Sequence, residues 1–171
     1  MTIESRLLEI ENKVRYMQIP VTNQLIAVRY TTNTGQTISD TNFTVVNYED
    51  KVYDALDLVT VGAAWSMFIP VTGLYRVSAM NRYASVTNWE VGEGTVMNLY
   101  KSGVLYTTLD RFDGGLANGN NISATLRGSD DVLAERGETL NIQLNNTSGG
   151  DRILNTTANH NRIAIHLVHT L

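Results

Sequence analysis

Hydrophobic and polar residues alternate along most of this chain with the two-residue period of a β-strand. The clearest case is residues 139–145, where Leu140, Ile142 and Leu144 alternate with polar neighbours, and the pattern recurs in residues 162–168. Because successive side chains of a strand point to opposite faces, this alternation predicts strands that each bury one face.

Short runs of this kind recur from residue 25 onwards, separated by segments rich in Gly, Asn and Ser. Turn residues at such short spacing, without a helical pattern between them, favour an antiparallel sandwich or jelly roll. We therefore predict an all-β fold, a ten-stranded antiparallel jelly-roll sandwich. The ten predicted strands are residues 25–31, 42–48, 65–69, 74–83, 95–100, 104–109, 123–127, 131–134, 139–145 and 162–168.

The beginning of the chain has a different period, with apolar residues at alternating intervals of four and three. This a/d spacing predicts that residues 1–20 form a short helix, either a trimerising coiled coil or an anchor, ahead of a β-domain at residues 21–171. The alternative is an amphipathic helix packed on its own domain, because two heptads make a marginal coiled coil. The apolar seam of the predicted trimerisation helix consists of Ile3, Leu7, Ile10, Val14 and Met17.

Three segments combine turn residues with the start or end of a predicted strand. In the first, Pro70 cannot donate to a sheet and Gly73 supplies turn freedom, so the chain turns a corner there. Residues 99–103, Leu-Tyr-Lys-Ser-Gly, predict a short hairpin. Residues 132–138, Val-Leu-Ala-Glu-Arg-Gly-Glu, predict another turn before the strand that begins at residue 139.

In this order, the three segments resemble the C1q/tumour-necrosis-factor jelly-roll family over residues 24–171. Residues 45–54, Val-Val-Asn-Tyr-Glu-Asp-Lys-Val-Tyr-Asp, resemble its bacterial and phage members. The chain departs from the family pattern where Phe68 and Pro70 stand one residue closer together, and where Glu138 replaces the usual aspartate. Residues 162–167 also lack the closing segment of many members, so the binding sites of the animal subfamily do not carry over.

Members of this family trimerise through a side of the sandwich rich in aromatic and aliphatic residues, so the resemblance implies a homotrimer. The chain has eight Tyr and only three Phe. A tyrosine can pack its ring at a contact while its hydroxyl stays hydrated, although these residues also suit ordinary strand positions. The candidate trimer-interface residues are Tyr30, Tyr75, Tyr100 and Tyr106.

Composition and charge narrow the possible chemistry. The formal net charge is −4 at pH 7, so we expect no nucleic-acid partner. Cysteine is absent, which excludes a disulfide scaffold, thiol catalysis and a cysteine-based zinc site. We find neither a signal-peptide pattern nor an apolar stretch of membrane-spanning length, and therefore expect synthesis in a host cytoplasm and no membrane partner.

Candidate chemistry is sparse. A nucleophile elbow, a phosphate-cradling glycine loop and a His-Glu-x-x-His motif are all missing from the sequence, so we expect no enzyme, no catalytic residue and no cofactor. His166 and His169 fall on opposite faces of a predicted strand, and Asp110 and Asp113 lack a calcium-binding spacing, so we expect no metal. Trp89, in a predicted loop, is the candidate ligand-binding residue, and the alternative is a lid folded over the sandwich edge.

Together these expectations favour a non-enzymatic trimeric protein of the virion surface, either a bacteriophage capsid-decoration (cement) protein or a short head fibre. Two heptads provide only ~20 Å of helix, too little for the shaft of a tail fibre but sufficient to anchor a knob. The expected partners are two further subunits and a major capsid protein or another virion component. The alternative is a receptor-binding or lectin-like adhesion module that contacts a host surface glycan through loops 87–94 and 112–121.

Overall fold

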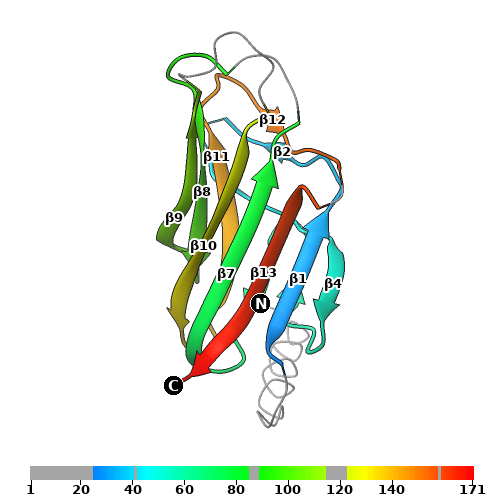
Figure 1. Ribbon diagram of the computed structural model, residues 1–171, viewed down its shortest axis with the longest axis vertical. Coiled ribbons are helices and arrows are strands. Elements are labelled where there is room, and N and C mark those ends of the chain that lie inside the picture. Colours follow the sequence, from blue (N-terminus) through cyan, green and yellow to red (C-terminus); the bar gives the residue numbers. More distant parts are fainter. Residues whose placement is uncertain (1–24, 41, 85–88, 115–122, 158) are drawn as a thin grey trace, which may run out of the picture.

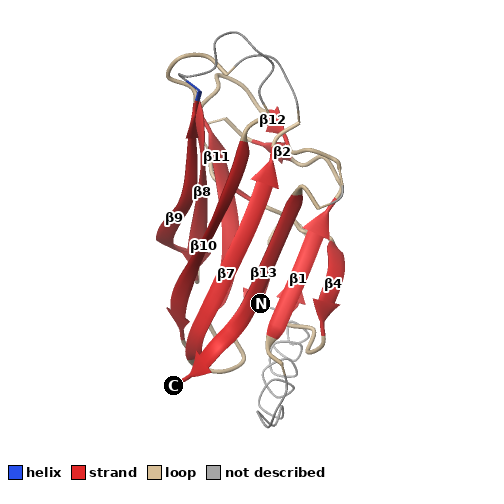
Figure 2. Cartoon of the chain, viewed as in Figure 1, coloured by secondary structure: helices blue, strands red, loops and turns tan. Residues whose placement is uncertain are grey.

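The computed structural model describes residues 25–40, 42–84, 89–114, 123–157 and 159–171, which form an all-β sandwich (Figures 1 and 2). The predicted helix and the predicted domain boundary at residue 20 lie outside these residues. Thirteen strands occur in the described part of the chain, against ten predicted. They are β1 (Ala27–Thr32), β2 (Thr37–Ile38), β3 (Thr44–Val45), β4 (Asp50–Asp54), β5 (Val59–Thr60), β6 (Ser66–Phe68), β7 (Gly73–Arg82), β8 (Gly94–Lys101), β9 (Val104–Asp113), β10 (Thr125–Ala134), β11 (Thr139–Asn146), β12 (Arg152–Ile153) and β13 (Asn161–Thr170).

Two antiparallel sheets make up the sandwich (Figure 1). The first has the strand order β10-β7-β13-β1-β4, and the second has the order β5-β6-β11-β8-β9, with β3 also paired to β11. A small sheet of β12 and β2 completes the structure. The predicted class, an all-β antiparallel jelly roll, is confirmed by this arrangement.

The core lies between the two sheets, where the alternation places one face of each long strand. Leu140, Ile142 and Leu144 of β11 are completely buried, as the sequence pattern predicts. Trp65 packs edge-on against Tyr48, with ring centroids 5.3 Å apart. Full burial of a large apolar side chain contributes about 1.5–3 kcal/mol, so these residues dominate the stability of the domain.

The observed strands differ most from the predicted ones at β10. Residues 123–127 and 131–134 were expected to form two separate strands, but β10 runs unbroken from Thr125 to Ala134. Gly128 lies within this strand and allows close packing: a Cβ atom there would lie 2.5 Å from the backbone oxygen of Leu109 in β9. The glycine therefore lets the edges of the two sheets approach each other.

Candidate functional site

Large apolar side chains are exposed along the edge of the sandwich where β9 and β10 run side by side, at the left in Figure 1. Val104, Leu105 and Tyr106 of β9 are 69%, 51% and 41% exposed, and Leu133 of β10 is 48% exposed. Because β9 is the last strand of its sheet, side chains on both of its faces can reach solvent. We call these four residues the edge patch.

An apolar hollow of about 300 Å³ lies at the opposite edge, beside β1 and β4 at the right in Figure 1. β4 ends the first sheet on this side, as β10 ends it on the other. Tyr53 of β4 lines the hollow and is 45% exposed. We call this feature the corner hollow, and its lining consists of Leu25, Ala27, Tyr53, Ala55 and Leu56.

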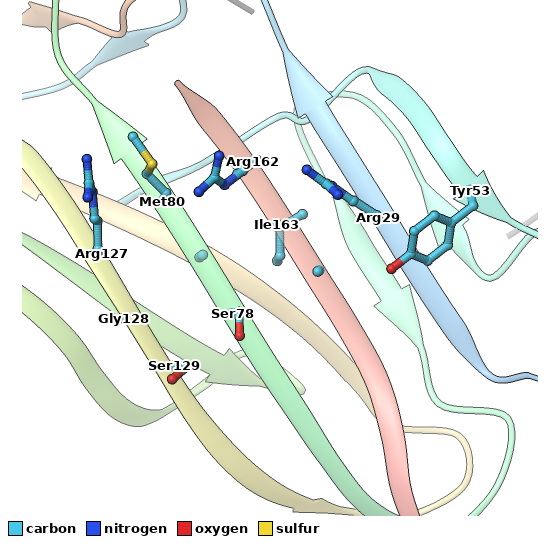
Figure 3. Close-up of a pocket in the computed structure, with 11 residues that line it drawn as sticks. Arg29, Tyr53, Ser78, Met80, Arg127, Gly128, Ser129, Arg162 and Ile163 are labelled. Atoms are coloured by element: carbon cyan, nitrogen blue, oxygen red, sulfur yellow. The ribbon is translucent and has the colours of Figure 1, made fainter. Parts of the chain in front are cut away.

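A second hollow, of about 620 Å³, lies on the outward face of the first sheet (Figure 3). The sheet surface is hollowed there because small residues are neighbours across three strands: Ser129 of β10 pairs with Ser78 of β7, and Ser78 pairs with Ala164 of β13. We call it the arginine hollow, after three of its lining residues. The lining consists of Arg29, Tyr53, Ser78, Ala79, Met80, Arg127, Gly128, Ser129, Arg162, Ile163 and Ala164.

The four candidate tyrosines lie in different surroundings. Tyr30 and Tyr75 occupy inward positions of their strands and are buried in the core, so their rings are not available to a second subunit. Their hydroxyls donate to Asp54 Oδ2 at 3.1 Å and to the Val71 carbonyl oxygen at 2.7 Å. Burial raises the pKa of Tyr75 to about 12.

The other two candidate tyrosines reach the surface of the second sheet. Tyr100 is half-buried and packs edge-on against Phe43, with ring centroids 6.0 Å apart. Tyr106 belongs to the edge patch. The alternation of residues along a strand is therefore what separates an exposed tyrosine from a core tyrosine.

Trp89 closes one end of the sandwich. The side chain is 1% exposed and packs edge-on against Tyr83 and Phe112, with centroid distances of 5.6 and 5.4 Å. The guanidinium of Arg152 lies 5.1 Å from the ring centroid. The tryptophan is thus a lid over the core and not an exposed platform for a ligand. Parts of both predicted ligand loops, residues 85–88 and 115–122, lie outside the described residues.

The carboxylates near these loops have protein partners. Asp110 Oδ2 accepts a hydrogen bond from the Arg127 backbone N–H at 2.7 Å, and Asp113 pairs with Arg111 at 2.8 Å. Within the described ranges, no group of three or more His, Cys, Asp or Glu residues could hold a metal ion. The same residues contain no helix long and apolar enough to cross a membrane.

The residues of the corner hollow and the arginine hollow are not among the candidate site residues predicted from the sequence. Arg29, Arg127 and Arg162 lie on three strands that are far apart in the sequence, and only the strand order brings them together. Each one is next to a buried apolar residue, which indicates an outward position. That signal was present in the sequence, but their common location was not.

Neither the family models nor the curated proteins compared with this chain give a match. Solved structures do. The chain is similar to the Eiger TNF of S. frugiperda, with a TM-score of 0.63, 13% identity, and 86% of this chain and 94% of that chain covered. It is also similar to the globular domain of zebrafish complement 1qA (TM-score 0.59, 16% identity, 85% and 98% covered) and to murine APRIL (TM-score 0.56, 11% identity, 85% and 100% covered). At these identities the likeness concerns the fold alone, which is a C1q/TNF-like jelly roll.

Proposed function

We propose that this chain is a non-enzymatic homotrimeric surface protein, in which the edge patch of each subunit packs into the corner hollow of the next. The observation that carries the proposal is the position of these two apolar surfaces at opposite edges of the sandwich. Two different surfaces make a head-to-tail contact, and such contacts form a closed ring when the rotation between subunits permits. A ring of three agrees with the trimers that the family resemblance implies.

The energetics favour a closed ring over a dimer. Four large side chains that are about half exposed would contribute on the order of 3–6 kcal/mol per contact from the edge patch alone. Each association event costs an estimated 4–15 kcal/mol in lost freedom, so one contact is marginal. A closed trimer has three contacts for two association events, which raises the gain relative to the cost.

The finer proposal is that the trimer decorates a virus particle, as a capsid-decoration protein or a short head fibre of a bacteriophage. Its support is the resemblance of residues 45–54 to bacterial and phage members of the family. On this proposal, residues 1–20 anchor the β-domain to a major capsid protein or another virion component. Removing these residues should abolish cosedimentation with particles while the circular dichroism of the β-domain persists, and retained cosedimentation would contradict the anchor.

The assembly is tested by the mass of the native protein and of two surface variants. At micromolar concentration we expect light scattering to give about 57 kDa for the native chain, three times 19.0 kDa. Leu105→Glu in the edge patch and Tyr53→Glu in the corner hollow should each give a folded 19.0 kDa monomer, because each buries a charge at the contact.

Val91→Glu is the matched control, because Val91 is 88% exposed and belongs to neither surface. This variant should remain trimeric. A native protein that is monomeric at micromolar concentration, or a Leu105→Glu variant that keeps the trimer mass, would overturn the proposed assembly.

A further inference from the structure

Three arginines surround the floor of the arginine hollow. Arg127 of β10 and Arg162 of β13 flank Met80 of β7 in one row of the sheet, and Arg29 of β1 pairs with Ala164 in the next row. In Figure 3, the side chain of Arg162 lies between β7 and β13, and that of Arg29 lies between β13 and β1. Arg127 lies on the other side of Met80, at the left of the view. Three guanidinium groups from three strands thus border one hollow.

Unlike most other basic side chains of the described residues, these three arginines have no carboxylate partner. Among the described residues, Arg29, Arg127 and Arg162 form no ion pair, and the one hydrogen bond from their guanidinium groups joins Arg162 Nη1 to the Asn159 carbonyl oxygen at 3.4 Å. The basic side chains that do pair with a carboxylate are Lys51, Arg76, Lys101, Arg111 and Arg152. Unpaired positive charge is therefore gathered at this hollow, in a chain whose net charge is −4.

We propose that the arginine hollow binds a phosphate monoester, a function beyond the assembly described above. A guanidinium presents a planar fork of donors that matches the oxygens of a phosphate. A phosphate monoester carries about −1.5 to −2 charges at pH 7 and three acceptor oxygens, whereas a carboxylate has one charge and two oxygens. The dianion therefore balances three arginines better, and the hydroxyls of Ser78 and Ser129 supply further donors on the floor.

The hollow has room for a small organic group attached to the phosphate. Its volume of about 620 Å³ lies within the range of small-molecule sites, roughly 300–1,000 Å³. Tyr53 forms one side of the hollow and can contact the organic part of the ligand through its ring. Tyr53 also borders the corner hollow, and it is the one lining residue that the two hollows share.

The test is calorimetric titration of the full chain with inorganic phosphate and with glycerol phosphate, at low salt and at about 0.15 M ionic strength. We expect one phosphate per subunit. Arg29→Gln and Arg162→Gln should each weaken binding by about tenfold or more, because each removes a charged hydrogen-bond donor. Arg29→Lys, which keeps the charge and loses the fork, should weaken it less than Arg29→Gln.

Arg111→Gln is the control, because Arg111 is an exposed arginine outside the hollow that pairs with Asp113. This variant should bind phosphate as the native protein does. Loss of binding equal to that of Arg162→Gln would mean that only general surface charge attracts the anion, and would overturn the site. The absence of saturable binding to either phosphate would also overturn it, and acetate binding as tightly as phosphate would refute the phosphate assignment.

Light scattering of the same samples separates this inference from the proposed assembly. A native trimer that binds no phosphate overturns the phosphate site and leaves the trimer in place. A monomer that binds phosphate, with affinity lost in Arg29→Gln and Arg162→Gln, supports the site and overturns the trimer.

Discussion

Asp54 is a buried carboxylate that holds together the edge of the first sheet. Its Oδ1 accepts the Leu58 backbone N–H at 3.0 Å, and its Oδ2 accepts the Val59 N–H and the Tyr30 hydroxyl, each at 3.1 Å. The residue thereby connects β1, the end of β4 and the start of β5. Burial, and then the charge of Asp54, raise the pKa of Tyr30 well above its usual value.

Replacing this carboxylate should cost more than removing one of its donors. Asp54→Ala leaves two backbone N–H groups and a hydroxyl without their acceptor, so we expect the free energy of unfolding to fall by about 2–4 kcal/mol. Tyr30→Phe should lower it by about 1 kcal/mol. Urea unfolding measures both changes. Asp50→Ala, at an exposed position of the same strand, should stay within about 0.5 kcal/mol of the native protein, and an equal loss there would contradict this role of Asp54.

At the scale of strands, β9 and β10 belong to different sheets and approach each other closely at Gly128. A methyl group at this position would lie 2.5 Å from the Leu109 backbone oxygen and 2.8 Å from the Leu109 Cβ, so the strands would have to separate. We expect Gly128→Ala to lower the free energy of unfolding by about 1–3 kcal/mol.

Gly150→Ala is the matched control for this prediction, because no atom lies within 4 Å of a Cβ atom built at Gly150. Its stability should equal that of the native protein in the same urea titration. Equal urea midpoints for Gly128→Ala and the native chain would show that β9 and β10 can separate to accept the methyl group with no loss of free energy of unfolding.

Strands were predictable from the sequence where one face is buried along a sufficient length. The alternation in β11 and β13 predicted both strands, because the pattern spans several periods. The two-residue strands β2, β5 and β12 are too short to show any period. β4 was missed as well, because four of its five residues are exposed and only Asp54 is buried.

The candidate surfaces were less predictable than the strands, because they depend on which face each residue occupies and on strand order. Within a strand, a shift of one residue moves a side chain from the core to the surface. Tyr30 occupies a core position of its strand, whereas Tyr106 occupies a surface position of another strand. The arginine hollow additionally requires β10, β13 and β1 to lie in one sheet. Local sequence contains no information on such distant neighbours.

For the whole molecule, a head-to-tail ring predicts that two assembly-deficient variants complement each other. Leu105→Glu retains the corner hollow, and Tyr53→Glu retains the edge patch, so a mixture can form one intact contact. We expect sedimentation of the mixture to show a heterodimer of about 38 kDa, twice 19.0 kDa, that cannot close into a trimer. Each variant alone should stay monomeric.

The same mixture distinguishes the ring from a two-fold arrangement. If the edge patches of two subunits contacted each other instead, Tyr53→Glu would keep its contact surface and dimerise on its own, and adding Leu105→Glu would produce no further species. A dimer of Tyr53→Glu alone, or a mixture that holds only monomers at the highest soluble concentration, would contradict the head-to-tail contact.

The central place of β13 in its sheet has a consequence for synthesis on the ribosome. β7 pairs with β10 and β1 pairs with β4, but only β13 joins these two halves. Its register places His166 opposite Ala27, a separation of 139 residues (166 minus 27). At a translation rate of about 5–20 residues per second, β1 waits on the order of 10 s for this neighbour. Both half-sheets are complete in sequence once residue 134 has been made, and the edges that β13 will cover stay open until residues 161–170 follow, which exposes them to non-native strand pairing.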